Sequence, residues 1–219
     1  MSQLKEVKDK LPISPILPKM DDLQTMKISE LNDDAIFEGG IIENAELGGV
    51  KASDVTFESS LLKNIDFSGA MLRGIKLCDV SAEKLNLANA DLERSNFDRV
   101  LIVGSRMTGV GIVASGLRDV VFKNCKLDLS FFRFSKLKNV KFENCVLTDV
   151  DFVGATLENV IFSESDITRA DFSQSKMKKI DICGSKIEGI KITSEQLSCL
   201  TIDYSQTVNI VQMMGIRIR

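Results

Sequence analysis

The side chains that most often carry chemistry are sparse or scattered in this chain of 219 residues. It has no histidine and one tyrosine, and its many carboxylates show no spacing that would pair a nucleophile with a base. The five cysteines are Cys78, Cys125, Cys145, Cys183 and Cys199, without a C-x-x-C pair. We therefore expect no catalytic residue, no cofactor, no metal ligand and no enzymatic activity.

Two of the cysteines, Cys125 and Cys145, are twenty residues apart. Both occupy the small-residue position of a repeat that runs through most of the chain. A buried free thiol fills such a position well, because cysteine behaves as a small apolar residue. We predict two buried free thiols here and neither a disulfide nor a redox pair.

A glycine-rich stretch, GVGIVASG at residues 109–116, resembles a loose phosphate-binding loop. Such a loop must follow a strand and open a helix. Ile112 instead continues the same five-residue repeat. We therefore predict that Gly109, Gly111 and Gly116 are corners of a repetitive structure.

Large apolar residues recur at every fifth position. This period matches neither a strand, whose buried face repeats every 2 residues, nor a helix, whose buried face repeats about every 3.6 residues. Every residue whose number ends in 2 or 7 from Phe37 to Ile202 is apolar, 34 positions in all. Ten of the twelve phenylalanines lie on this register. A small residue lies two places earlier and a polar one between them, as in segments 90–92 (Ala-Asp-Leu) and 170–172 (Ala-Asp-Phe).

This unit resembles that of the pentapeptide-repeat family, whose members fold as a right-handed quadrilateral β-helix. The resemblance implies an all-β fold in which five residues form one side of a square and twenty residues form one turn. Residues twenty positions apart, which would stack in successive turns, are of similar type. One such column is Ile102, Phe122, Phe142, Phe162 and Ile182. We predict a solenoid of about eight coils over residues 35–202, with the phenylalanine rings stacked inside.

Two segments lie outside the predicted solenoid. Residues 1–34 include LPISPILP, whose prolines favour an extended N-terminal arm. Residues 203–219 begin with Asp203 and Gln206 in a capping-box pattern. They predict a short capping helix over 204–214, ended by Gly215 and followed by a tail.

Several positions that should face solvent are apolar. A stripe beside one core column consists of Ile41, Leu61, Leu101, Val121 and Ile161, and a weaker patch of Met71, Val113, Phe131 and Val153. We expect the arm around Leu11 to Leu17 to cover part of the stripe. The alternative is that the stripe is a partner surface, because contiguous exposed apolar patches mark interfaces.

A basic strip is predicted on another side of the rod. Its members are Arg99, Arg118, Lys136, Lys138, Lys176, Lys178 and Lys179. Phosphate or acidic-protein binding is one interpretation. A solvated face is favoured, because Asp98, Asp119 and Glu158 are interspersed.

The C-terminal helix predicts self-association. Its apolar residues spread over a wider arc than one capping stripe needs, which leaves Met213 and Ile216 as the expected exposed members. A self-complementary patch at the end of a rod favours a two-fold dimer. Similar topoisomerase-binding members of the family dimerise through this region, so a C-terminal homodimer is expected.

The weak net charge of −3 does not indicate a nucleic-acid partner. No signal peptide or membrane-spanning run is present, so we expect a soluble cytoplasmic protein. The preferred function is a non-enzymatic protein-interaction module of unknown partner. The alternative follows from the resemblance: some similar proteins bind DNA gyrase or topoisomerase IV as mimics of duplex DNA and confer quinolone resistance. Mixed charge and the unbroken repeat disfavour that alternative, and an enzyme is the distant third.

Overall fold

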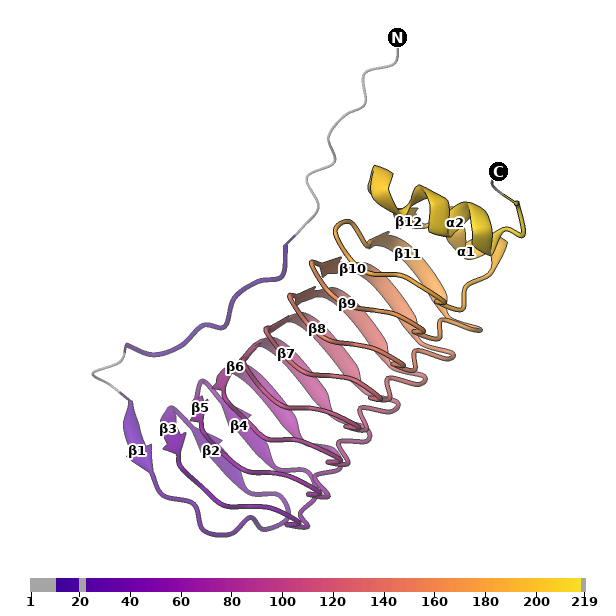
Figure 1. The fold of residues 1–219 in the computed structure, drawn as a ribbon. Coiled ribbons are helices and arrows are strands. Elements are labelled where there is room, and N and C mark those ends of the chain that lie inside the picture. Colours follow the sequence, from indigo (N-terminus) through magenta and orange to yellow (C-terminus); the bar gives the residue numbers. More distant parts are fainter. Residues whose placement is uncertain (1–10, 20–22, 218–219) are drawn as a thin grey trace.

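The computed structural model describes residues 11–19 and 23–217, and it is a parallel β-solenoid of about nine turns. Successive turns lie side by side along the rod in Figure 1. The N-terminal segment runs along one side of the rod, and the C-terminal helices cover the last turn (Figure 1). The predicted fold is confirmed.

Short parallel strands build the solenoid. They are β1 (Gln24–Met26), β2 (Ile36–Glu38), β3 (Gly40–Glu43), β4 (Thr56–Glu58), β5 (Leu61–Lys63), β6 (Lys76–Glu83), β7 (Asn96–Val103), β8 (Gly116–Lys123), β9 (Lys136–Glu143), β10 (Thr156–Ser163), β11 (Lys176–Asp181) and β12 (Leu200–Thr201). Phe142 pairs with Phe122 on one neighbouring strand and with Phe162 on the other. Each turn therefore contains twenty residues, as the sequence predicts.

Each turn has four sides, which we name by their central core residues. Side A is centred on Leu117 and Leu137, side B on Phe122 and Phe142, side C on Leu127 and Leu147, and side D on Phe132 and Phe152. Every residue from Ile42 to Phe172 whose number ends in 2 or 7 is buried. The five-residue spacing thus places one apolar side chain per side inside the rod, where burial of each Leu, Ile, Phe or Met stabilises the fold by about 1.5–3 kcal/mol.

The corners between sides share one backbone conformation. Every fifth residue from Asp34 to Gly189 has a positive φ. Gly, Asn and Asp adopt this left-handed conformation at low cost, and they fill most corners. Gly109 is such a corner, as predicted, but Gly111 and Gly116 are not, because they lie within sides D and A.

The solenoid differs from the prediction at both ends. β1 pairs with β3, and Leu31 is buried, so the coil begins before residue 35. At the other end a helical turn, α1 (Ser194–Leu197), replaces the strand expected on side A. The predicted C-terminal helix is present as a 3-10 turn, η2 (Tyr204–Gln206), followed by α2 (Thr207–Met213).

Two glutamines close the last turns. Gln196 and Gln206 each belong to a capping box, and each is buried. The Gln206 Nε2 group donates to the carbonyl oxygens of Ile182 and Ser185 at 2.6 and 2.7 Å. Side-chain amides thereby pair carbonyl groups that a further coil would otherwise satisfy.

Candidate docking surfaces

Three large apolar side chains are exposed around side D on a single turn. Leu129 is 53% exposed, Phe131 42% and Phe134 62%. We call these three residues the side D patch. Phe131 lies within side D, whereas Leu129 and Phe134 occupy the corners on either side of it.

The backbone makes this patch unusual. Leu129 and Phe134 both have φ of 58°, in the left-handed region that bulky residues disfavour. Among the corners in the described part of the chain, no other holds a large apolar side chain. Neither residue contributes to the buried core, so their placement serves no evident purpose in folding.

Small and charged neighbours frame the side D patch. A Cβ added at Gly154 would come within 2.6 Å of the Phe134 ring, so this glycine lets the ring lie against the next corner. The Arg133 side chain forms an ion pair at 2.5 Å with Asp151, which lies on the following turn beside Phe131. The patch is therefore an apolar surface bordered by a charge pair, the composition common at protein interfaces.

The apolar stripe beside side B is less exposed than the sequence suggests. Leu61 is buried, and Ile41, Leu101, Val121 and Ile161 are half-buried. The stripe adjoins the A–B corner, which is the column formed by residues 79, 99, 119, 139, 159 and 179. The stripe is therefore a poor candidate for a broad bare interface.

The N-terminal arm lies along the A–B corner. The backbone N–H of Ile16 donates to Asp79 Oδ1 at 2.8 Å, and that of Ile13 donates to Asp119 Oδ1 at 3.2 Å. Asp79 and Asp119 are two turns apart. The arm thus sits next to the stripe, attached through its main chain, while Leu11, Ile13 and Ile16 are themselves exposed.

Arginines neutralise the aspartates near this corner. Arg99 donates to both carboxylate oxygens of Asp79, at 2.7 and 2.6 Å. This hydrogen bonding holds the pKa of Asp79 below its usual range. Arg118 binds Asp98 through two nitrogens and lowers the pKa of that carboxyl in the same way. Arg99 and Arg118 are thus already paired within the protein.

The predicted basic strip separates into paired and unpaired parts. Lys138 and Lys178 both approach Glu158, at 3.8 and 2.9 Å. Among the described residues, Lys136, Lys176 and Lys179 form no ion pair within 4 Å. Two of these three unpaired lysines, Lys176 and Lys179, lie on β11, and Lys136 lies on β9.

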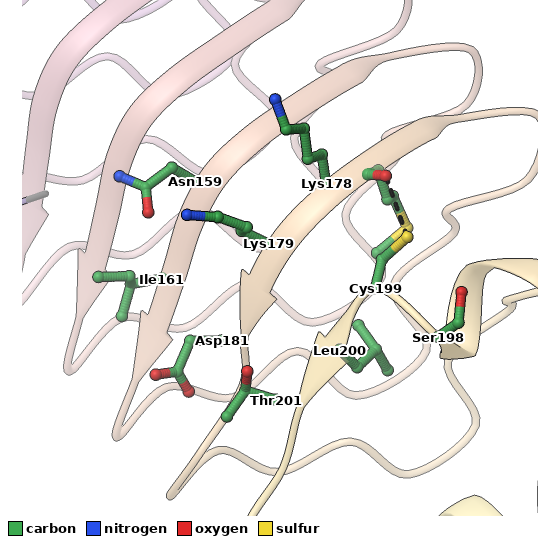
Figure 2. A pocket seen from close by; sticks show the side chains of 10 residues that line it. Asn159, Ile161, Lys178, Lys179, Asp181, Ser198, Cys199, Leu200 and Thr201 are labelled. Atoms are coloured by element: carbon green, nitrogen blue, oxygen red, sulfur yellow. Dashed lines mark hydrogen bonds between the residues drawn. The ribbon is translucent and has the colours of Figure 1, made fainter. Parts of the chain in front are cut away.

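A cavity of about 400 Å³ opens at the C-terminal end of the A–B corner. Its lining residues are Asn159, Ile161, Met177, Lys178, Lys179, Asp181, Ser198, Cys199, Leu200 and Thr201. Figure 2 shows Lys179 and Asn159 on the same side of this opening, and Ser198 at the end of α1. Sequence reasoning missed the cavity because it missed α1, whose only signal is the Thr193–Gln196 capping box.

The C-terminal end agrees with the sequence only in part. Met213 is half-buried and packs against the core, so it is wrong to count it among the exposed residues. Ile216 is 51% exposed, as expected. Tyr204 and Val208, one helical turn apart, are also exposed, at 94% and 49%.

The two stacked cysteines behave as predicted. Cys125 and Cys145 are free and buried, and their thiols approach the carbonyl oxygens of Ile102 and Phe122 at 3.4 Å. The neighbouring Cys125 thiol and burial raise the pKa of Cys145. A thiol held neutral in this way is unreactive.

Comparison with known proteins supports the fold. The model of a pentapeptide repeat region matches residues 114–192, so this part of the chain is a pentapeptide repeat region and the resemblance is confirmed. A comparison with curated proteins gave no significant match. No helix in the described residues is long and apolar enough to cross a membrane.

Solved structures with similar folds include pentapeptide-repeat proteins from different settings. A trypsin-treated variant of QnrB1, a plasmid-mediated fluoroquinolone resistance protein, is 16% identical, with a TM-score of 0.42 over 90% of this chain and 99% of the other. HetL, involved in heterocyst differentiation regulation in Nostoc sp. strain PCC 7120, is 17% identical, with a TM-score of 0.30 over 77% and 85%. A protein of the Arabidopsis thaliana thylakoid lumen is 21% identical, with a TM-score of 0.41 over 44% and 69%.

Proposed function

We propose that this chain is a non-enzymatic module that binds a protein partner through side D of its rod. One observation carries the proposal: Leu129 and Phe134 are large, apolar and exposed at left-handed corners, where Asn, Asp or Gly would cost less. Strained backbone at an exposed position is characteristic of functional sites. Aromatic residues are also enriched where protein interfaces bury most surface.

A rigid rod suits such a role. The stacked core fixes the spacing between turns, so the side D patch is preformed and loses little conformational entropy on binding. Phe131 and Phe134 would supply the buried contacts, and the Arg133–Asp151 pair would lie at the rim. The patch is small, so the complete interface would extend over neighbouring turns of side D.

DNA gyrase and topoisomerase IV are the named partners to test, because QnrB1 is a fluoroquinolone resistance protein with a similar fold. Charge gives one reason for this choice: residues 30–58 contain eight carboxylates and one lysine, and none of these forms an ion pair in the described structure. An acidic end is the feature that a mimic of DNA requires. The same rod carries paired charges over its later turns, so we rank this partner second to an unidentified protein.

The experiment compares the full-length protein with a double variant, Phe131→Ser and Phe134→Asn. Val146→Ser is the control, because Val146 is 39% exposed on side C. A photo-reactive residue at position 129 would cross-link the partner in cells of the source organism, and purified gyrase would be assayed for supercoiling. Partner capture by the wild-type and control proteins but not the double variant supports side D. Equal capture by all three proteins contradicts it.

A further inference from the structure

The A–B corner already binds one extended peptide, the arm of the same chain. Two main-chain N–H groups three residues apart reach Asp79 and Asp119, which are two turns apart. Three residues in polyproline II conformation span about 9 Å, and two turns of a parallel solenoid span about 10 Å. The near match explains how an extended segment can follow this corner in register.

The same corner continues beyond Asp119 to the cavity lined by Asn159 and Lys179. Here the corner carries a cation, Lys179, in place of the carboxylates of Asp79 and Asp119 that bind the arm. Lys179 forms no ion pair among the described residues, and Lys178 adds a second ammonium group whose partner is Glu158. Asp181, the acidic residue of the lining, is engaged by the backbone N–H of Cys183 at 2.9 Å.

The last turn also leaves a strand edge open. β12 pairs with β11 only at Ile180 and Asp181, because α1 takes the place of the next strand. The β11 segment from Met177 to Lys179 therefore has no strand partner in the last turn and lines the cavity. The Met177 carbonyl oxygen accepts from the Cys199 thiol at 3.1 Å, so the edge is free of such a contact at Lys179. An exposed strand edge can bind the main chain of an extended peptide, as in recognition by strand addition.

We propose that this cavity binds an acidic side chain of an extended peptide from a protein partner. The peptide main chain lies along the edge of β11 at Lys179, whose ammonium group binds the carboxylate, and Lys178, which also pairs with Glu158, lies beside it. The site is separate from the side D patch, so a negative result for one proposal leaves the other unaffected. Its ligand class follows from three local features: a strand edge without a strand partner, the Lys179 ammonium group that forms no ion pair in the described structure, and a corner that holds an extended segment two turns long.

The test measures binding of two dye-labelled peptides to the full-length protein by fluorescence anisotropy. The acidic peptide is acetyl-Pro-Asp-Glu-Pro-Asp-Glu-amide, and the neutral one replaces Asp with Asn and Glu with Gln. We expect the acidic peptide to bind at least about tenfold more tightly at low salt. Equal affinity of the two peptides, or no binding of the acidic one at millimolar protein, overturns the proposal.

A matched pair of variants locates the site. Lys178→Glu with Lys179→Glu reverses two charges at the cavity, and Lys51→Glu with Lys76→Glu reverses two exposed charges five or more turns away, neither of which forms an ion pair in the described structure. The first pair should weaken the acidic peptide about tenfold or more, and the second about twofold at most. Equal weakening would show a diffuse charge effect and overturn the site. Bound peptide should also slow alkylation of Cys199, which lines the cavity, and leave Cys183 unaffected.

Discussion

Phe142 and Phe162 stack with their ring centroids 5.1 Å apart and their planes 6° from parallel. Phe152, from side D, meets each of them edge to face, at 6.4 and 6.0 Å. Two ladders of rings, one from side B and one from side D, therefore interlock along the axis. Each ring in the middle of the rod contacts aromatic neighbours in two directions, which adds to the burial energy.

Replacing Phe142 with Ala should lower the free energy of unfolding by about 3–5 kcal/mol, because it removes a fully buried ring that stacks in the side B ladder and contacts the side D ladder. Phe131→Ala is the control, since this ring is 42% exposed. Its loss should cost about 1 kcal/mol or less. Urea titration of both variants measures the difference, and a loss below about 1 kcal/mol for Phe142→Ala would contradict the stacking.

Replacing Phe134 with Asn should raise stability by about 0.5–1 kcal/mol. The left-handed conformation at φ 58° disfavours Phe, whereas Asn tolerates it. Thermal unfolding of this single variant checks the sign. A gain in stability together with a loss of partner binding would show that the phenylalanine is kept for function. A clear loss of stability would show instead that its packing on Gly154 matters for the fold.

Replacing Gln206 with Ala should loosen α2 and cost about 1–3 kcal/mol. The change leaves the carbonyl oxygens of Ile182 and Ser185 buried without their donor. Hydrogen exchange of residues 207–213 should accelerate, while exchange on β8 should not. Gln212→Ala, at an exposed position of α2, is the control. Equal exchange in the two variants would show that Gln206 does not hold the cap.

The arm should detach in acid. Arg99 lowers the pKa of Asp79 in the folded protein, so the ionised carboxylate favours the native structure at neutral pH. This contribution is fully present above the ordinary aspartate pKa, near 3.9, and is lost as the pH falls through the lower folded value. Protection of the Ile16 amide from hydrogen exchange should therefore persist at pH 5 and fall at lower pH.

A double variant tests the arm at neutral pH. Asp79→Gly with Asp119→Gly removes both acceptors but keeps residues that suit left-handed corners. Exchange at Ile13 and Ile16 should become fast. Asp149→Gly is the control, because it removes another corner aspartate, the partner of Arg169, away from the arm. Unchanged protection in the double variant would show that side-chain packing, and not these hydrogen bonds, holds the arm.

The sequence predicts the core well, because the repeat is a property of every turn. Phe122 and Phe142 could be placed one above the other from their numbers alone. The ends were harder to predict, since each capping element occurs once: Gln196 turns inward only because Thr193 caps a helical turn that breaks the repeat. Of the side D patch, the sequence predicted only Phe131 as an exposed apolar residue. Leu129 and Phe134 became informative once their backbone angles were known.

The C-terminal end remains a predicted dimer interface, but the residues expected to form it have changed. Tyr204 and Val208 lie on one face of the terminal helices and are exposed, and Ile216 follows nearby, whereas Met213 packs inward. Apolar residues at the end of a rod suit a two-fold contact, in which each copy offers the same surface.

Sedimentation of the intact protein at micromolar concentration should show a dimer. Val208→Glu with Ile216→Glu should yield a monomer, because two carboxylates on each copy would be buried against each other. Gln212→Glu, which adds charge at an exposed polar position of α2, should leave the dimer intact. A monomeric wild-type protein contradicts the prediction, and a dimer that survives the double substitution places the interface elsewhere on the rod.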